Sequence, residues 1–398
     1  MTLARLAGDD ILMATRSRKT INQVSTMQDR QVVSIDGVSG ELASPAVKAG
    51  GLVFVSGVSP TGADGKPAGA DIASQTRLAI ERLATVLEAA GSSLAHAMSV
   101  HVYLKLASDF DAMNGVYRQA FSDKPPARTT VVTDLGGGAS ISMSAIAVPV
   151  GASREVLHPA GWMQSPRPYS YIVRAGGLVF LSGLVSRRGT DDQVVPGSVA
   201  FQTKTILDNA GVLLKTAGLS FQHVVAARVF LTDDSLFEEM NNQYRLYFTA
   251  DPPARATAVT ELMGHDALIE ITLIASESGK QVLGPAVSPS LPLSTAVRAG
   301  DLLFLSGVLG NTDANASDLP AQTKEIYARI RRTLEGAGLS FSHVVDNTVY
   351  VRDVWQQRQV DAISREIFPK DPPARTVVGA KLVARTGLVE MMMTAAGR

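Results

Sequence analysis

The chain of 398 residues contains no cysteine, and this absence excludes several classes of protein. Without thiols there is no disulfide framework, no thiolate nucleophile and no zinc site with cysteine ligands. Lysine plus arginine equal aspartate plus glutamate, at 37 each. Because counterion release requires clustered positive charge, we expect no nucleic-acid partner.

Long hydrophobic runs are also absent. No apolar stretch approaches the ~20 residues that a membrane helix requires, and residues 1–30 lack the apolar core of a signal peptide. We therefore expect no membrane partner and a cytoplasmic location. Residues 1–30 are expected to form a flexible tail, with a folded extra element as the alternative.

The most informative pattern is the tetrapeptide Pro-Pro-Ala-Arg, which occurs three times. Its arginines are Arg128, Arg255 and Arg375, separated by steps of 127 and 120 residues. Each is preceded by a Gln-Thr pair at the same spacing of 53 residues. A repeat of this length predicts three copies of one domain, at residues 31–150, 154–276 and 281–398.

The first copy shows the expected order of elements. Residues 46–57 are typical of two strands around a Gly-Gly turn. An apolar stripe over residues 72–90, between Asp71 and Gly91, predicts a helix with caps at both ends. Alternation at residues 100–105 predicts a third strand.

A second helix is expected to end at Phe121, because the following Pro-Pro pair cannot continue it. Two closing strands are predicted at residues 128–133 and 140–148. The order β-β-α-β-α-β-β defines an α+β fold, and residues 150–168 and 277–292 are interpreted as linkers between copies.

In this order of elements the helices cover one sheet face, and the other face needs a partner. Three joined copies supply three such faces. We therefore predict a closed pseudo-trimer within one chain, with its sheets inward, which acts as a monomer or associates further.

Several motifs in the repeat resemble one known family. They are the AVKAGGLVFVSG segment, the helix with the Gln-Thr pair, the Ala-Ala-Gly cap, AMNGVY, PPAR and the final strand, and they recur in order over nearly the whole chain. The chain is similar to the RidA/YjgF family of enamine/imine deaminases. The resemblance implies a chorismate-mutase-like fold, here with the usual homotrimer fused into one polypeptide, and active sites between adjacent copies. It implies hydrolysis of 2-enamino or 2-imino acids to 2-keto acids and ammonia, with no cofactor.

The resemblance gives the three repeated arginines a role. Arg128, Arg255 and Arg375 match the family arginine that holds the substrate carboxylate. A guanidinium presents two parallel donors to a carboxylate, and this grip positions the adjacent imine carbon for attack by water. The alternative is an arginine at a strand start that is paired with a local acid.

The catalytic carboxylate is expected on the last strand. The resemblance places the family glutamate at Ser144, Thr272 and Met392, so the usual carboxylate is missing in all three copies. Glu270 and Glu390 stand two residues earlier, where the first copy has Ser142. At roughly 6.5–7 Å along the strand, they could replace the family glutamate through a shifted substrate or a bridging water. The alternative is a solvated strand carboxylate.

Other family positions are kept unevenly, so the three sites are expected to differ. The substrate-side tyrosine is Tyr169, with Ala43 and Leu293 as its counterparts. Further substrate contacts are expected from Asn114, Asn241, Ser56, Ser182, Ser306 and Thr272. For the three serines the alternative is a strand-end turn. The third copy has Asp361 at the position of Asn114 and Asn241. We predict that the active site lies around the second copy, with Arg255, Tyr169, Asn241 and Glu270.

Three histidines are also periodic, at His96, His223 and His343. They lie between a helix cap and a strand with no second ligand at zinc-like spacing, so we interpret them as structural and expect no metal. His265 is unique to the second copy and is a candidate for the site, with a solvated loop residue as the alternative.

These patterns favour a hydrolytic deaminase of small 2-imino or 2-enamino acids. Two alternatives remain open: a divergent relative that acts on a specialised imine, and a pseudo-trimer that binds carboxylates without catalysis. In each case the partner is a small molecule that carries a carboxylate.

Overall fold

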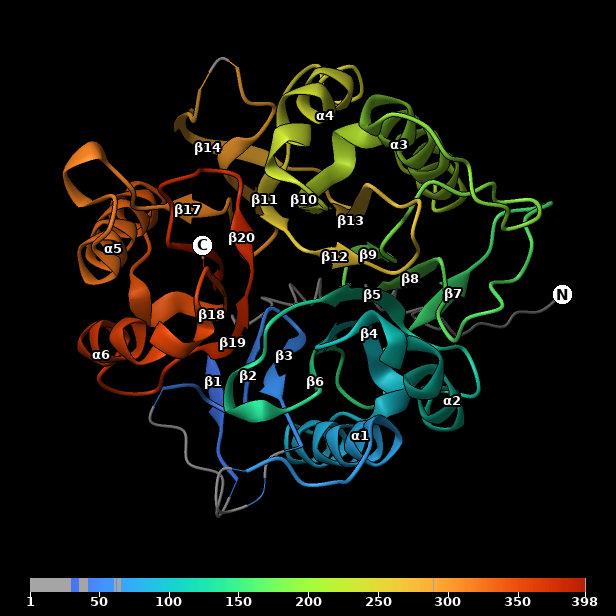
Figure 1. The fold of residues 1–398 in the computed structure, drawn as a ribbon, viewed down its shortest axis with the longest axis horizontal. Helices are drawn as coiled ribbons and strands as arrows, with labels where there is room; N and C mark the ends of the chain where they lie inside the picture. The colour runs from blue at the N-terminus through green and yellow to red at the C-terminus, as the bar shows by residue number, and fades with distance from the viewer. Residues whose placement is uncertain (1–29, 36–41, 61, 63–65, 289, 398) are drawn as a thin grey trace, which may run out of the picture.

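The computed structural model describes residues 30–35, 42–60, 62, 66–288 and 290–397. Almost all of the predicted tail at residues 1–30 therefore lies outside the described residues. Each third of the chain forms one sheet and two long helices, and Figure 1 shows the helices on the outside of a three-lobed ring with the strands inside. None of the helices in the described part of the chain is long and apolar enough to cross a membrane.

The three repeats share one order of main elements, and the second and third contain additional short strands. The first has β1 (Gln31–Val33), β2 (Ala46–Ala49), β3 (Leu52–Val58), α1 (Ile72–Ala89), β4 (Ala97–Leu104), α2 (Phe110–Ala120), β5 (Ala127–Val132) and β6 (Ile141–Ala147). The second has β7 (Glu155–Leu157), β8 (Ile172–Ala175), β9 (Leu178–Leu181), α3 (Val199–Thr216), β10 (Val224–Leu231), α4 (Phe237–Tyr244), β11 (Ala254–Val259), β12 (Glu261–Leu262) and β13 (Ile269–Ser276). The third has β14 (Gln281–Ala286), β15 (Ser294–Ala299), β16 (Leu302–Leu305), β17 (Val308–Leu309), α5 (Leu319–Gly336), β18 (Val344–Val351), α6 (Gln357–Ile367), β19 (Ala374–Gly379), β20 (Lys381–Leu382) and β21 (Val389–Ala396).

The predicted order β-β-α-β-α-β-β and the α+β fold are confirmed, with one correction. The predicted linkers at residues 150–168 and 277–292 contain the edge strands β7 and β14, which pair with β8 and β15. Their Gly, Pro and Ser content concealed these strands.

Local signals in the sequence account for the ends of the long helices. The side chain of Asp71 accepts from the backbone N–H of Ser74 at the start of α1, and Asp318 does the same for Ala321 at the start of α5. Such caps satisfy backbone donors that have no partner within the helix. Just after α1, Gly91 has φ 75°, a left-handed conformation that glycine adopts without steric cost.

Pairing of strands from neighbouring repeats joins the repeats into the ring. Strand β12 of the second repeat pairs with β5 of the first, and β20 of the third repeat pairs with β11 of the second. An isolated bridge between Asp134 and Gly379 makes the corresponding contact between the third and first repeats. Each repeat therefore extends the sheet of a neighbour, which covers an edge that would otherwise be exposed.

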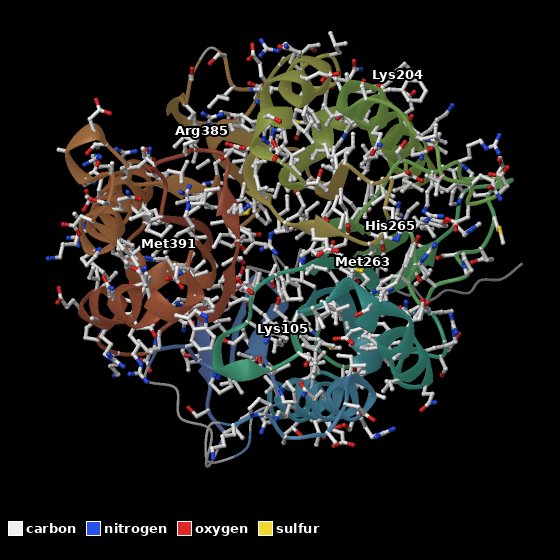
Figure 2. The ribbon with its side chains drawn as sticks, in the orientation of Figure 1. Lys105, Lys204, Met263, His265, Arg385 and Met391 are labelled. Carbon is white, nitrogen blue, oxygen red and sulfur yellow. The ribbon has the colours of Figure 1, made fainter. Side chains whose placement is uncertain are left out.

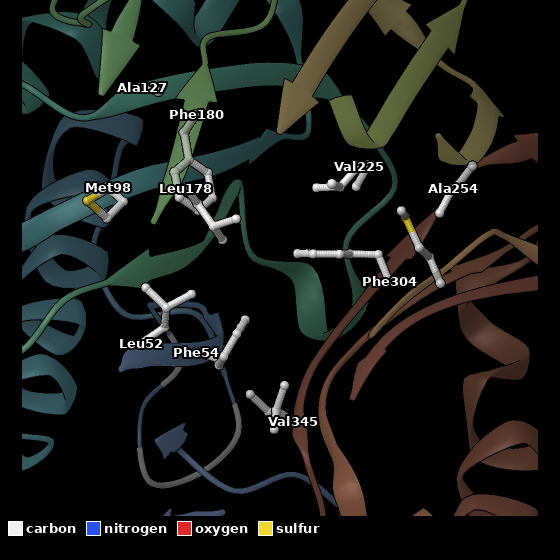
Figure 3. Packing of buried hydrophobic residues seen from close by; sticks show 14 of the residues in the cluster. Leu52, Phe54, Met98, Ala127, Leu178, Phe180, Val225, Ala254, Phe304 and Val345 are labelled. Atoms are coloured by element: carbon white, nitrogen blue, oxygen red, sulfur yellow. The ribbon is translucent and has the colours of Figure 1, made fainter. Parts of the chain in front are cut away.

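The hydrophobic residues form one shared core and three outer ones. The outer cores lie between each sheet and its own helices. The shared core lies among the three sheets and contains equivalent residues from each repeat, such as Phe54, Phe180 and Phe304 (Figure 3). The prediction that the sheets face inward is thus confirmed.

One layer of the shared core contains polar side chains, and they differ between the three repeats. The equivalent positions carry His101, Arg228 and Thr348, and Arg228 Nη2 donates to Thr348 Oγ1 at 2.9 Å. Arg228 Nη2 also lies 3.9 Å from a carboxylate oxygen of Asp346, whose pKa burial raises to about 6. Burial, followed by the nearby charge of Arg228, lowers the pKa of His101 well below its usual value. A homotrimer would bring three copies of one residue together here, whereas the fused chain combines three different ones.

Phe180→Ala is expected to lower the free energy of unfolding by about 3–5 kcal/mol, because it removes a large side chain from the shared core. The matched control is Phe201→Ala in the same repeat, since Phe201 is about half exposed and its loss is expected to cost less than about 1 kcal/mol. Urea denaturation measures the free energy of unfolding of both variants. Equal effects of the two substitutions would contradict a core shared among the sheets.

Candidate functional site

The repeated arginines lie where successive repeats meet. The backbone N–H of Arg128 in the first repeat donates to Ser182 Oγ in the second at 2.8 Å. Arg255 and Ser306 make the same bond between the second and third repeats, and Arg375 and Ser56 make it between the third and first. We call these contacts interfaces 1–2, 2–3 and 3–1. Each interface therefore combines an arginine of one repeat with a strand end of the next.

The repeated serines connect strand ends, and their backbone N–H groups have partners within the chain and are not free for a ligand. The N–H of Ser182 donates to the Tyr171 carbonyl, and the N–H of Gly183 donates to the Arg128 carbonyl. The Ser182 hydroxyl donates to the Ser170 carbonyl at 2.8 Å. The backbone N–H groups of Ser306, Gly307 and Ser56 are used in the same way. The strand-end alternative describes these residues.

At interface 3–1 the guanidinium is paired with an acid. Arg375 Nη1 lies 2.7 Å from Asp361 Oδ1, and both side chains are buried. The position of Glu270 is taken here by Ser142. Because Asp361 neutralises the arginine, this interface matches the alternative of a local ion pair and is a poor site for a carboxylate.

At interface 2–3 the arginine is buried against an amide and an aromatic ring. Arg255 is only 1% exposed, and its Nη2 donates to Asn241 Oδ1 at 2.7 Å. Its guanidinium carbon lies 4.8 Å from the ring centre of Tyr244. Glu390 is close enough for its charge to favour the protonated arginine. The expected partnership of Arg255 with Asn241 is thus present.

Interface 1–2 contains a pocket beside its arginine. A cavity of about 60 Å³, the inner pocket, is lined by Phe110, Arg128, Thr130, Arg167, Tyr169, Gly183, Val185, Arg187, Met263 and Glu270. The guanidinium carbon of Arg128 lies 4.8 Å from the ring centre of Tyr117 and 5.8 Å from that of Tyr169. Arg128 Nη1 is buried and has no hydrogen-bond partner among the described residues, and the same holds for two nitrogens each of Arg255 and Arg375. An arginine with an unused donor in a pocket is a candidate site for an anion.

The predicted grouping of site residues needs a correction. Tyr169 and Glu270 lie with Arg128 in the inner pocket, whereas the prediction placed them with Arg255. The reason is the order of the ring: each arginine faces the following repeat, so residues of the second repeat complete the site of the first. Asn114 is buried on α2, and its Oδ1 has no hydrogen-bond partner in the described part of the chain.

Glu270 is the carboxyl group of the inner pocket. It is 4% exposed, and burial raises its pKa to about 8, although the backbone N–H of Thr130 and the charge of Arg128 act in the opposite direction. A Cβ atom on Gly183 would lie 1.9 Å from Glu270 Oε1, so only glycine allows this approach. Glu390 is equally buried at interface 2–3, with a pKa raised by burial to about 8. The interpretation of both residues as solvated carboxylates is therefore wrong.

Thr272 lies deeper than expected. Its Oγ1 is 2.6 Å from Thr129 Oγ1, and it lines a central cavity of about 40 Å³ together with its counterparts Ser144 and Met392. These three positions face the centre of the ring rather than the inner pocket. The position beside the arginine is that of Glu270, Glu390 and Ser142, so two of the three interfaces retain a carboxyl group there.

The periodic histidines stabilise short turns. His96 Nδ1 lies 2.7 Å from Ser93 Oγ, and the ring nitrogens of His223 and His343 make the corresponding contacts with serines. His265, in contrast, lines a larger cavity of about 800 Å³, which we call the outer cavity, at interface 1–2. Figure 2 shows His265 and Met263 between the first and second repeats.

The sequence analysis missed several pocket residues. Arg167 stands two residues before Tyr169, so the tyrosine motif could have suggested it. Arg187 and Val185 belong to the loop after Ser182, whose length varies between copies and gave no signal. Phe110 begins α2 in the first repeat, and only the folded ring brings it beside residues of the second.

Comparisons with known proteins agree with this architecture. A family model described as Endoribonuclease L-PSP matches residues 39–149, 162–277 and 284–397. A RutC family protein of Sulfurisphaera tokodaii is 37% identical over 110 residues, which is 28% of this chain and 88% of the relative. A protein of Bos taurus named 2-iminobutanoate/2-iminopropanoate deaminase is 34% identical over 138 residues, which is 35% of this chain and 96% of the relative.

A crystal structure of chorismatase has a similar fold over most of the chain. It has a TM-score of 0.53 and 14% identity, and the match covers 76% of this chain and 93% of chorismatase. The three family matches and the single-domain relatives lead to one conclusion: the chain belongs to the RidA/YjgF family and carries three tandem domains of it.

The thermal midpoint of the protein is expected to fall as the pH rises toward and through about 8. A glutamate has an ordinary pKa of 4.5, and the fold raises this value to about 8 for Glu270 and Glu390. Folding therefore favours the protonated form, so the stabilisation is complete below about 4.5 and is lost as pH passes the folded pKa.

Thermal unfolding of wild type and of a Glu270→Gln/Glu390→Gln double variant between pH 4.5 and 9 measures this effect. The double variant should have a flatter profile, and Glu88→Gln on the exposed side of α1 should keep the wild-type slope. A double variant with the wild-type slope would contradict the burial of the two carboxyl groups.

Proposed function

We propose that the inner pocket at interface 1–2 hydrolyses small 2-imino or 2-enamino acids to 2-keto acids and ammonia. The observation that carries this proposal is the pairing, in one pocket, of Arg128 with an unused donor and Glu270 with a raised pKa. The bovine relative, which carries a deaminase name, supports the same class of reaction. No step of the reaction below requires a cofactor.

Arg128 binds the substrate carboxylate. Its guanidinium lies beside the rings of Phe110, Tyr117 and Tyr169 and remains charged, so it offers parallel donors to a planar anion in a small pocket. Fixing the carboxylate also fixes the neighbouring carbon of the C=N bond. Positioning of this kind replaces an encounter in solution by a reaction within one complex.

Glu270 moves the protons. Its carboxyl group gives a proton to the imine nitrogen, water attacks carbon 2, and the carboxylate takes a proton from that water. The product of this step is a 2-amino-2-hydroxy acid. The same carboxyl group then protonates the amino nitrogen, the C–N bond breaks as the hydroxyl oxygen forms C=O, and the hydroxyl proton returns to Glu270. Ammonia and the 2-keto acid leave, and a group with a pKa near the working pH suits both directions of transfer.

Arg128→Gln is expected to lower kcat/KM for freshly generated 2-iminopropanoate by about 100-fold, because it removes a charge-assisted bidentate contact. Arg255→Gln and Arg375→Gln are the matched controls and should change it less than about threefold, since those arginines lie at the other two interfaces and do not line the inner pocket. Release of keto acid and ammonia above the spontaneous rate is the readout. Equal losses in the three variants, or wild type no faster than the spontaneous reaction, would reject the proposal, and binding without turnover would favour the non-catalytic alternative.

The rate should depend on the protonation of Glu270. In wild type kcat/KM is expected to fall as the pH rises above about 8, because the ionised carboxyl group can no longer protonate the imine. Glu270→Gln should lower the rate by about 10²–10⁴-fold and abolish this pH dependence. Glu390→Gln is the control with the same change at another interface. A wild-type pH profile in Glu270→Gln would assign the proton transfer elsewhere.

A further inference from the structure

Two arginines of the inner pocket have no part in the reaction described above. Arg167 and Arg187 line the pocket together with Arg128, so three arginines border a space of about 60 Å³. Arg167 is close enough to Arg128 for its charge to lower the pKa of that residue. A substrate with a single carboxylate would occupy only Arg128.

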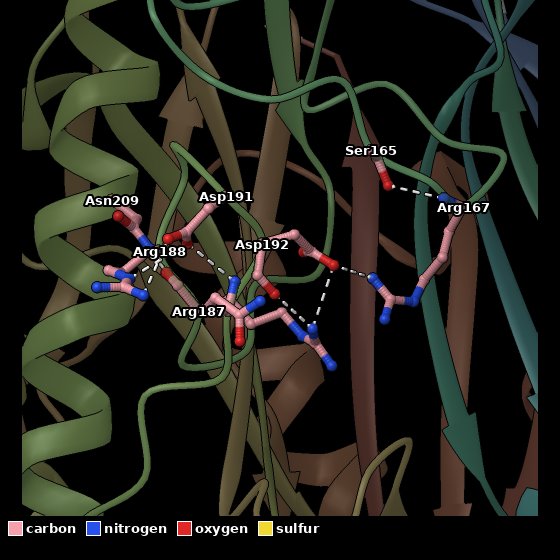
Figure 4. A network of polar contacts seen from close by, with 8 residues as sticks. Ser165, Arg167, Arg187, Arg188, Asp191, Asp192 and Asn209 are labelled. Atoms are coloured by element: carbon pink, nitrogen blue, oxygen red, sulfur yellow. Dashed lines mark hydrogen bonds and ion pairs between the residues drawn. The ribbon is translucent and has the colours of Figure 1, made fainter.

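Asp192 holds both additional arginines in place. Arg167 Nη1 lies 2.8 Å and Arg187 Nη1 3.1 Å from Asp192 Oδ2, and Arg187 Nη1 also donates to the Asp192 carbonyl at 2.7 Å (Figure 4). Asp192 has φ 56°, an uncommon left-handed conformation for a residue other than glycine. Such conformations persist where surrounding contacts fix them, and here the loop is closed by a bridge between Arg187 and Val194.

The charges around the inner pocket do not balance. Arg167 and Arg187 share one carboxylate, Asp192, so this group of three residues has a net positive charge. The acid that lines the pocket itself is Glu270, which is mainly protonated at neutral pH because burial raises its pKa to about 8. A single substrate carboxylate compensates Arg128 and leaves one positive charge without a counterpart.

The two additional arginines also lie where the inner pocket meets the outer cavity. The inner pocket and the outer cavity share four lining residues, namely Phe110, Arg167, Arg187 and Met263. The outer cavity, of about 800 Å³, has room for a longer substrate. Its lining also includes His265 and two acids, Asp111 and Glu261, which do not line the inner pocket.

By position in the sequence, neither of these two arginines has an arginine counterpart in the other copies. Counting from the repeated serine, the position of Arg187 is Asn311 in the third copy and Thr61 in the first. The position of Arg167, two residues before the tyrosine, is Leu291 in the third copy and Glu41 in the first. The additional charge thus lies in the same pocket as Arg128 and Glu270. Their shared pocket allows one ligand to contact all of these groups.

We propose that the substrate of the inner pocket carries a second oxyanion, a carboxylate or a phosphate, at the end remote from the imine, and that Arg187 and Arg167 bind it where the pocket meets the outer cavity. The inference rests on the proposed function for the identity of the imine, but the second anion concerns binding alone. Asp192 is a positioning residue, which keeps the two guanidinium groups on the wall.

Calorimetry with 2-oxo acids tests this inference without requiring turnover. Each diacid is compared with the monoacid of equal chain length: oxaloacetate with 2-oxobutanoate, 2-oxoglutarate with 2-oxopentanoate, and 2-oxoadipate with 2-oxohexanoate. A further arm uses 2-oxo-4-phosphonobutanoate to distinguish phosphate from carboxylate. At least one doubly charged compound should bind about tenfold or more tightly than its singly charged partner, since hydrogen bonds to charged groups are worth that much. No preference in any pair would overturn the inference.

Variants then show which residues cause the tighter binding of diacids over monoacids. Arg187→Gln should reduce it to about threefold or less, while the affinity for the monoacids changes little. Arg188→Gln is the matched control, since Arg188 belongs to the same loop but pairs with Asp191 and is 60% exposed, so the preference should persist. A preference that survives Arg187→Gln and the Arg167→Gln/Arg187→Gln double variant would assign the second anion to another site.

The same compounds separate the two proposals. Tight binding of a diacid with no hydrolysis of any imine would sustain the second-anion site and reject the deaminase. Fast hydrolysis of 2-iminopropanoate with no preference for diacids would do the reverse. Hydrolysis of the corresponding imino diacid with a lower KM than 2-iminopropanoate would support both.

Discussion

The hydrogen bond from the backbone N–H of each repeated arginine to a serine hydroxyl of the next repeat is the constraint on which the sites depend. It fixes the start of one strand against the end of another, so the guanidinium always projects from one repeat toward residues of its neighbour. Strand exchange and the shared hydrophobic core hold the same arrangement over a longer range. The three sites are therefore properties of the ring and not of any single domain.

Fusion of the copies allows the three interfaces to differ while the scaffold stays nearly symmetric. At interface 3–1 the arginine forms a buried ion pair with Asp361, and at interface 2–3 it donates to Asn241. At interface 1–2 the arginine lines a pocket together with Tyr169, a carboxyl group and two further arginines. The polar contact between Arg228 and Thr348 in the centre is a second place where the repeats differ. Three identical subunits would bring three copies of one residue together there. A single chain can thus confine a ligand site to one of three equivalent places.

The sequence predicted the repeat, the order of elements and the inward sheets, because these depend on hydrophobic periodicity and on caps such as Asp71 and Gly91. It also named Arg128, Tyr169 and Glu270 as candidate site residues, and the structure places all three in the inner pocket. It grouped two of them with the wrong arginine, because the direction in which each repeat faces its neighbour is a property of the assembled ring. Burial of Glu270 could not be predicted either, since an alternating strand does not reveal whether another repeat covers its inner face. The pair of Arg167 and Arg187 depends on the conformation of a loop around Asp192, for which the sequence gave no periodic signal.

The central claim is that one interface of three binds a carboxylate. Its most direct test is a crystal structure of the protein with 2-oxobutanoate. The account predicts a single bound molecule per chain, at interface 1–2, with its carboxylate on the Arg128 guanidinium and its oxo group toward Glu270. Equal occupancy of all three interfaces, or a ligand on Arg255 or Arg375 with the Arg128 pocket empty, would contradict it.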